Sequence, residues 1–268
     1  MSPPPTTTAS SLVQVSGLIK EYSSNRGITR VVDGVSFSIF EGETLGLVGE
    51  SGSGKSTIAR MILRLIEPTA GSVRFNGEDL RSVSPRRLRA LRRQMQIVFQ
   101  DPYAALNPRM SVRQILAEPF AIHREKPAGG QQSRLLELLK SVGLEASALT
   151  RYPHEFSGGQ RQRINIARAL ALQPRFLVLD EPVSALDVSV GAQVINLLRD
   201  LQRQHGLTFL FISHSMPLVR YICDRIAVLH RGQLVECGDS EQVSTAPSNP
   251  YTQQLIAATP ELPAELSS

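Results

Sequence analysis

The sequence has few cysteines and no long apolar run, and both absences limit what the protein can be. Its two cysteines, Cys223 and Cys237, share no C-x-x-C spacing and have no histidine or cysteine cluster near them. We interpret them as small apolar residues in a reducing cytosol. The longest apolar runs, such as residues 209–212, are far shorter than the roughly 20 residues that span a bilayer. Residues 1–11 lack a basic start and an apolar stretch, which predicts a flexible tail and no signal peptide. We therefore expect a chain that is soluble by itself and reaches a membrane only through a partner.

The composition is that of a folded protein with a mild positive charge. The 268 residues are 41% hydrophobic and 20% charged, with a formal net charge of +5. This length allows one large α/β domain or two modest ones, and the low charge content excludes a disordered chain. The charge suits an anionic ligand, a lipid surface or a nucleic acid, and it selects none of them.

The most informative stretch is residues 49–57. An apolar run at 45–48, which predicts a buried strand, precedes it, and a predicted helix at 58–66 follows it. Strand, glycine-rich turn and helix form the P-loop pattern G-x-x-x-x-G-K-[ST], whose backbone N–H groups hold phosphates. Lys55 can reach the outer phosphates, and the Ser56 hydroxyl can hold Mg²⁺. A glycine/serine linker that matches by chance is disfavoured because both flanks fit. The candidate phosphate site comprises Gly49, Glu50, Ser51, Gly52, Ser53, Gly54, Lys55, Ser56 and Thr57.

Two alternating stretches before the P-loop predict strands at residues 12–19 and 29–40, with a turn at 23–27. Tyr22 follows the first of them. Its ring could be a platform for a flat base, because an aromatic face offers apolar area to adenine. An ordinary surface tyrosine at a strand end is an equally good interpretation of this residue alone.

Residues 85–93 predict a helix that carries five arginines. A nucleic-acid patch is conceivable there, but no aromatic side chains interleave with the arginines. Leu88 and Leu91 mark an ordinary buried side, so a solvated basic face is the favoured interpretation.

A predicted strand at 96–99 ends at Gln100, and residues 101–108 contain two prolines that break regular structure. The periodicity becomes helical from residue 111 to about 152, with a strongly amphipathic helix at 131–142. This block predicts a helical insert in a β/α chain.

A second anion-binding feature precedes the predicted helix at 161–172. Ser157 can cap its N-terminus, and Gly158 and Gly159 leave that end free of side chains. Such a helix end is suited to face an anion.

Polar residues follow two further predicted strands. The strand at 176–179 ends in Asp180 and Glu181; one carboxylate there can hold Mg²⁺ and the other can polarise an attacking water. A helix-capping acidic pair is the alternative. His214 follows the strand at 207–212. Because the C-terminal ends of parallel strands share one edge, we expect His214 and both carboxylates to face the same phosphates.

The remaining predictions are a strand at 72–75, a helix at 190–204, a hairpin of 225–229 with 233–236, and short helices at 239–243 and 250–258.

With these motifs in order, the sequence resembles the nucleotide-binding subunits of ATP-binding cassette transporters. The resemblance covers residues 12–260, and the signature Ser157-Gly158-Gly159-Gln160 is nearly diagnostic. One departure is Phe156, where many members have leucine. The resemblance implies an α/β fold: a P-loop ATPase core with a mixed central sheet and flanking helices, an N-terminal antiparallel β subdomain and a helical subdomain at about 101–172. Residues 1–11 and 261–268 would be flexible tails of this single domain.

The resemblance also implies a role for each motif. Tyr22 would stack on adenine, Gln100 would sense Mg²⁺ and the attacking water, and His214 would contact the γ-phosphate. Asp180 would support Mg²⁺ together with Ser56 and Gln100, and Glu181 would be the general base. The signature and Asp187 would serve a nucleotide shared with a second cassette, in a head-to-tail dimer that holds two ATP molecules. The signature residues are Ser157, Gly158, Gly159 and Gln160.

Residues 99–109 and 249–260 resemble the ATPases of oligopeptide and dipeptide importers. The resemblance implies two transmembrane permease subunits, an identical or homologous second ATPase and an extracytoplasmic binding protein, with this chain peripheral on the cytoplasmic face of the inner membrane. The same group includes importers of nickel, glutathione and opines. Some members carry an iron–sulfur cysteine cluster, which we do not expect with only two cysteines.

Two other classes of P-loop protein fit the sequence less well. Soluble cassette ATPases that act on DNA or ribosomes usually have tandem cassettes or a long coiled coil. This chain has one cassette and no sustained heptads between Gln100 and Ser157, so we expect no nucleic-acid partner. The second class is the P-loop kinases, in which nothing would require the signature at residues 157–160.

Overall fold

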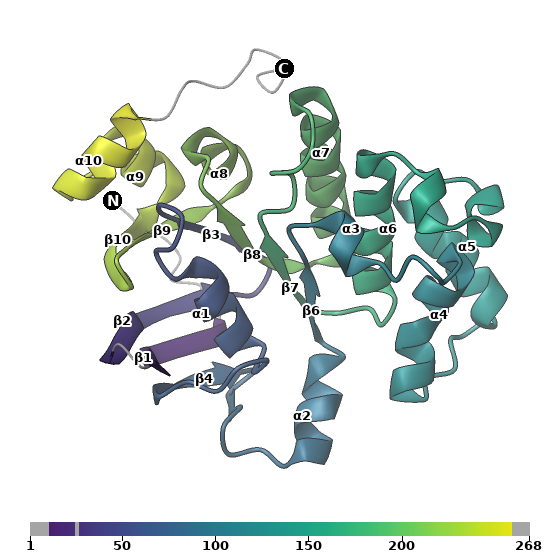
Figure 1. Ribbon diagram of the computed structural model, residues 1–268, viewed down its shortest axis with the longest axis horizontal. Helices are drawn as coiled ribbons and strands as arrows, with labels where there is room; N and C mark the ends of the chain where they lie inside the picture. Colours follow the sequence, from purple (N-terminus) through teal and green to yellow (C-terminus); the bar gives the residue numbers. More distant parts are fainter. Residues whose placement is uncertain (1–10, 25–26, 259–268) are drawn as a thin grey trace, which may run out of the picture.

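Two β-sheets with helices around them make up the protein (Figure 1). The computed structural model describes residues 11–24 and 27–258. Residues 1–10 of the predicted tail at 1–11 and the whole predicted tail at 261–268 lie outside the described residues, as do residues 25–26 of the predicted turn. The first described strand begins at Ser11, one residue before its predicted start.

The N-terminal sheet is antiparallel, with the order β2-β1-β4-β5. Its two long strands pair along most of their length, and inward apolar residues such as Val13 and Val15 are buried. This alternation is the pattern that predicted the strands. The strands are β1 (Ser11–Ser24), β2 (Gly27–Phe40), β4 (Ala70–Phe75) and β5 (Glu78–Asp79).

The central sheet is mixed, with the order β10-β9-β3-β8-β7-β6. Five strands run parallel and β10 is antiparallel to β9. The middle strands β3, β7 and β8 are buried at every residue, which explains their continuous apolar sequences. The sheet comprises β3 (Thr44–Val48), β6 (Met95–Val98), β7 (Phe176–Asp180), β8 (Thr208–Ser213), β9 (Arg225–His230) and β10 (Gln233–Asp239). The predicted fold class is confirmed.

The helices match most of the predictions and add two. The predicted helices correspond to α1 (Lys55–Ile62), α2 (Pro85–Arg92), α4 (Val112–His123), α5 (Gln131–Ser141), α6 (Gly158–Leu170), α7 (Val188–His205), α9 (Ser240–Thr245) and α10 (Pro250–Ala257). Two 3₁₀ turns, η1 (Ala146–Thr150) and η2 (Pro153–Glu155), lie between α5 and α6. Sequence reasoning missed α3 (Pro102–Ala105), within a stretch expected to be irregular, and α8 (Met216–Ile222).

The expected helix at 58–66 needs correction at both ends. It begins at Lys55 and ends at Ile62. Arg64 has φ 49°, and this left-handed conformation ends the helix although the apolar periodicity continues. Arg64 N donates to Met61 O at 2.9 Å and Leu65 N donates to Arg60 O at 2.8 Å. These two local bonds form a C-terminal cap, so the helix stops although the apolar residues continue.

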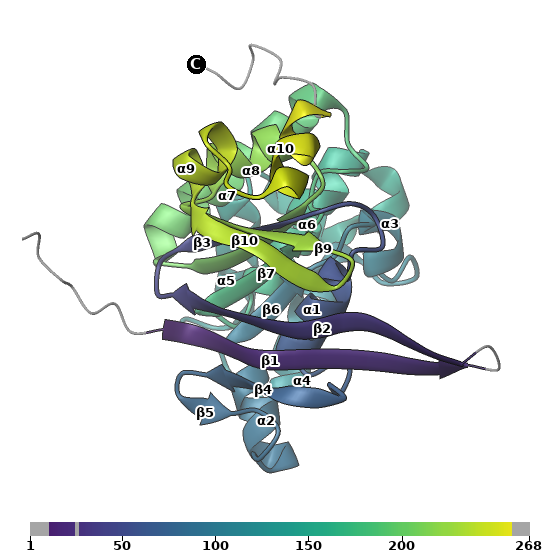
Figure 2. The same ribbon diagram turned by 90° about the vertical axis from the view of Figure 1, so that its left-hand side faces the viewer.

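Two apolar clusters cover the faces of the central sheet. Along β7, Phe176 and Val178 belong to the cluster shared with α1 and the N-terminal sheet, whereas Leu177 and Leu179 belong to the cluster shared with α4 to α8. The β9–β10 hairpin lies beside β2 (Figure 2), where Asp33 N donates to Gly232 O at 2.8 Å. Within residues 11–24 and 27–258, no helix has the length and apolar character that a membrane span needs.

Candidate phosphate site

The P-loop joins the end of β3 to the start of α1, and its backbone is tightly enclosed. Gly49 has φ 150°, and a Cβ atom there would lie 2.1 Å from the carbonyl oxygen of Leu229. Gly54 has φ 106°, and its Cβ would lie 2.8 Å from Val31 O. Only glycine fits these two positions, so packing of β9 and β2 requires the glycines that the motif contains.

Lys55 closes this loop on itself. Its Nζ donates to Gly49 O at 2.7 Å and to Glu50 O at 2.8 Å. Burial lowers the pKa of the Lys55 ammonium, while the carboxylates of Glu181 and Asp180 act in the opposite direction. The Ser53 Oγ is buried without a hydrogen-bond partner among the described residues. The loop thus holds a cation and an unpaired hydroxyl, which fits a phosphate-binding cradle.

A cavity of about 510 Å³ opens in front of the loop. Residues from three strand ends and from the P-loop surround it, as expected for the C-terminal edge of a parallel sheet. Its lining is Val31, Ser51, Gly52, Gly54, Lys55, Ser56, Thr57, Gln100, Glu181 and His214.

Ser56 and Asp180 meet at the floor of the site. Ser56 Oγ donates to Asp180 Oδ1 at 3.0 Å. Burial raises the pKa of Asp180, and the hydrogen bond from Ser56 opposes this shift. A carboxylate beside a hydroxyl is the oxygen donor set that a hard divalent cation prefers. Neither Asp180 nor Glu181 is the N-cap residue of a described helix, so the helix-capping interpretation of the acidic pair does not hold for the part of the chain that the structure describes.

Glu181 lies between two polar side chains that come from other strand ends. Its Oε2 accepts a hydrogen bond from Gln100 Nε2 at 3.2 Å and lies 3.2 Å from His214 Nδ1. The backbone of Glu181 has φ 47°, a conformation that costs a non-glycine residue free energy and is concentrated at functional sites. The three residues predicted to be catalytic are thus brought together around one oxygen.

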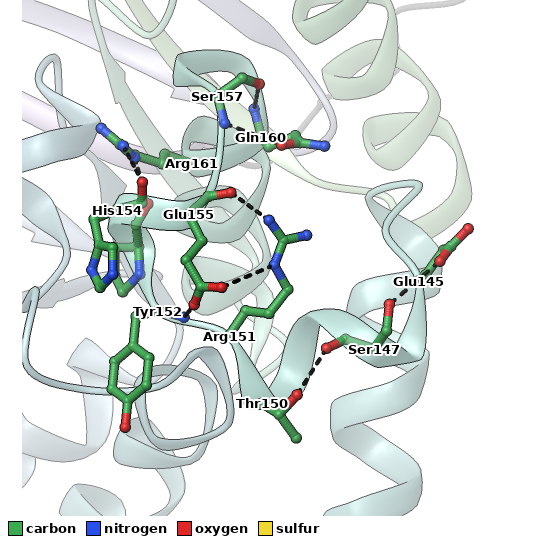
Figure 3. Close-up of polar contacts among 11 residues, drawn as sticks. Glu145, Ser147, Thr150, Arg151, Tyr152, His154, Glu155, Ser157, Gln160 and Arg161 are labelled. Atoms are coloured by element: carbon green, nitrogen blue, oxygen red, sulfur yellow. Dashed lines mark hydrogen bonds and ion pairs between the residues drawn. The ribbon is translucent and has the colours of Figure 1, made fainter.

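The signature residues lie elsewhere, at the start of α6 (Figure 3). Ser157 Oγ accepts from Gln160 N at 3.3 Å, and Gln160 Oε1 accepts from Ser157 N at 3.1 Å. This capping box confirms the predicted N-cap role of Ser157. Gly159 is buried, and a Cβ there would lie 2.3 Å from Val190 Cγ1. Among the described residues that line the cavity, none belongs to the signature.

Tyr22 and Asp187 also stand outside the cavity lining, as do Asp180 and the P-loop residues Gly49, Glu50 and Ser53. Tyr22 is 44% exposed, with Lys20 Nζ 4.9 Å from its ring centroid. Asp187 is the exposed N-cap residue of α7. Conversely, Val31 lines the cavity although an ordinary strand valine carries no recognisable sequence signal.

Comparison with known proteins points to one family. A family model described as ABC transporter matches residues 32–184. The chain is 52% identical to a putative peptide import ATP-binding protein of Brucella ovis, over 94% of this chain and 80% of that protein. It is 51% identical to the oligopeptide transport ATP-binding protein OppF of Bacillus subtilis, over 93% and 82% of the two chains.

Solved structures resemble the fold over most of its length. The dimeric, post-hydrolysis ATP-binding cassette MJ0796 bound to ADP and Pi has a TM-score of 0.76 and 31% identity, covering 85% of this chain and 98% of its own. The cbiO1 protein of Clostridium perfringens, part of the ABC transporter complex cbiONQ, has a TM-score of 0.77 and 28% identity, covering 87% and 90%.

Proposed function

The chain belongs to the ABC transporter family, and we propose that it is the ATP-hydrolysing subunit of an importer that energises peptide uptake across the cytoplasmic membrane. The chemistry rests on one observation above all: Glu181, Gln100 and His214 converge in front of the P-loop. The peptide assignment rests on the names of relatives about half identical to this chain.

Ser56, Asp180 and Gln100 are the residues that would hold Mg²⁺. The ion supplies positive charge to the phosphate oxygens when it is bound. Lys55 binds the outer phosphates in this proposal, because it lines the cavity in front of the loop. The backbone N–H groups of residues 49–57 and the N-terminus of α1 orient the phosphate chain.

Glu181 acts as the general base. Its carboxylate accepts a proton from the attacking water, while Gln100 and His214 hold it in place from two sides. His214 is 62% exposed through its side chain, so it can also turn toward the γ-phosphate. Holding one oxygen of Glu181 with two side chains reduces the reorganisation that the reaction requires.

A second cassette completes the site. Because Ser157 to Gln160 lie outside the chain's own cavity, the helix end they form is available to a nucleotide on a partner subunit. Dimeric structures of the related cassette MJ0796 support this arrangement. Asp187 would lie at the same interface, and Tyr22 would stack on adenine.

The importer would contain two permease subunits, a second ATPase of identical or homologous sequence, and an extracytoplasmic solute-binding protein. The chain would lie on the cytoplasmic face of the inner membrane. Nickel, glutathione or opine import is the alternative within the same class of systems, and nucleic acid is not a proposed partner.

Uptake in cells tests this function. A strain without the chain should lose uptake of a labelled oligopeptide mixture, and the wild-type chain should restore it. The Lys55→Ala chain, which should bind ATP more weakly, should fail to restore uptake. The Glu241→Gln chain is the matched control, since this exposed side chain lies on α9. Intact peptide uptake together with loss of nickel, glutathione or opine uptake would overturn the peptide assignment.

A further inference from the structure

The C-terminal segment that resembles peptide-importer ATPases contacts the back of the P-loop. Glu50 N donates to the hydroxyl of Tyr251 at 3.4 Å, across 201 positions of sequence. Tyr251 lies in the first turn of α10, the last described helix. We propose that Tyr251 is a positioning residue of the ATP site, which holds the entry of the P-loop in shape through the backbone of Glu50.

Glu50 is held on its other side by the loop itself. Its carbonyl oxygen accepts from Lys55 Nζ at 2.8 Å and from Ser53 N at 3.2 Å. The N–H of Glu50 therefore bonds to α10, while its C=O bonds to residues of the P-loop. A shift of Tyr251 is therefore transmitted through the backbone of Glu50 to the carbonyl group that holds Lys55. Tyr251 does this without contacting the nucleotide itself.

The Tyr251 ring is fixed by stacking. It lies 3.8 Å from the His230 ring between centroids, with 13° between the planes. His230 ends β9, and two residues later Gly232 N donates to Ser53 O at 3.0 Å. The β9–β10 turn and Tyr251 thus reach the P-loop at two neighbouring points. Burial raises the pKa of the Tyr251 phenol, so the hydroxyl stays neutral at physiological pH.

The start of α10 is anchored separately. The Glu236 carboxylate accepts from Ser248 N and Oγ, each at 2.8 Å, and from Asn249 N at 3.3 Å. Asn249 Oδ1 then accepts from Tyr251 N at 2.9 Å and caps the helix. Asn249 Oδ1 therefore holds the backbone of Tyr251, and Glu236 holds Ser248 and Asn249 just before the helix, which gives the contact a rigid base.

Removal of the Tyr251 hydroxyl should loosen the nucleotide-free loop. A neutral hydrogen bond is worth about 1 kcal/mol, or roughly a fivefold change in an equilibrium constant. ATP would have to order the looser loop on binding, so its affinity falls. Once phosphates are bound they order the loop themselves, and the rate of the chemical step stays close to that of the wild type.

Tyr251→Phe isolates this contact, because phenylalanine keeps the ring against His230. The matched control is Tyr221→Phe on α8, whose hydroxyl donates to Asn196 Oδ1 at 2.9 Å. Hydrogen–deuterium exchange of the nucleotide-free chain should show faster exchange in peptides that contain Glu50 for Tyr251→Phe only. The KM for ATP should rise roughly fivefold for the same variant, with kcat within about twofold of the wild type.

A second variant, Glu236→Gln, loosens the anchor of α10 and leaves the hydroxyl in place. It should also raise the KM for ATP, by a smaller factor than Tyr251→Phe does. Unchanged exchange and KM in Tyr251→Phe, or equal changes in both tyrosine variants, would overturn the proposal. This role of Tyr251 rests on the ATP site of the proposed function and does not depend on which solute is transported. A wild-type chain without ATPase activity would refute that function, while exchange at Glu50 would still test the contact.

Discussion

His214 Nδ1 lies 3.2 Å from Glu181 Oε2, so a titratable ring touches the carboxylate that is proposed to accept a proton from water. The two residues follow neighbouring strands of the central sheet. The backbone of Glu181 supports the contact, since Glu181 N donates to Ile212 O at 3.0 Å. The left-handed φ of Glu181 is the local cost of turning its side chain toward His214.

Glu181→Gln should bind ATP with an affinity close to the wild type and hydrolyse it roughly 10²–10⁴ times more slowly. The amide keeps the shape of the side chain but cannot accept a proton. Steady-state phosphate release and binding of a fluorescent ATP analogue measure the two effects. Because phosphate contacts remain, ATP should also trap a dimer visible by size-exclusion chromatography. Wild-type turnover in this variant would refute the base assignment.

Asp180→Asn should stabilise the Mg²⁺-free chain at neutral pH by roughly 0.5–2 kcal/mol while abolishing hydrolysis. Burial raises the pKa of Asp180, so the folded chain binds a proton there more tightly than the unfolded chain does. The stability that this group contributes is present below its unfolded pKa and is lost as the pH rises through the folded pKa. Urea unfolding with a chelator at pH 5 and pH 7.5 should show a larger gain at the higher pH. A variant that is less stable than the wild type at pH 7.5 would contradict this account.

Ser157→Arg should leave ATP binding intact and stop hydrolysis, because Ser157 lies outside the chain's own cavity. The added charge and bulk would block the helix end proposed to face the partner's nucleotide. Lys55→Ala should instead weaken ATP binding itself, which a fluorescent nucleotide measures. If this chain pairs with itself, a mixture of the two inactive variants should recover part of the activity, since a head-to-tail mixed dimer contains one intact site. Full hydrolysis by Ser157→Arg alone would refute the shared site.

Gly159→Ala should destabilise the fold by about 1–3 kcal/mol, because its Cβ would lie 2.3 Å from Val190 Cγ1 in a buried contact between α6 and α7. Gly158→Ala is the matched control: its Cβ would lie 3.4 Å from Leu186 Cδ2, so the change should stay within about 0.5 kcal/mol. Urea denaturation midpoints compare the two. Equal midpoints would contradict this prediction and show that the Val190 side chain moves aside with no loss of stability.

Local patterns were sufficient for the central strands and the P-loop. The runs at 45–48 and 176–179 are apolar without interruption because β3 and β7 are buried on both faces. Helix α3 was not predicted because it has only four residues and begins at Pro102, which we interpreted as a break in regular structure. Its cap is a local contact across that proline, in which Tyr103 N donates to Asp101 Oδ1 at 2.8 Å. Helix α8 is similarly short and buries only Met216, Val219 and Ile222 on one side.

By itself the sequence determined which side chains are available for phosphate chemistry. Lys55, Ser56, Asp180 and Glu181 each stand at a strand end or helix start that continuous local patterns define, and the parallel sheet then collects them at one edge. Only the tertiary structure decided that Tyr251 touches the P-loop while Ser157 stays outside the cavity. Those placements depend on how α10 and α6 pack against distant elements, and no periodic signal along the chain encodes such contacts.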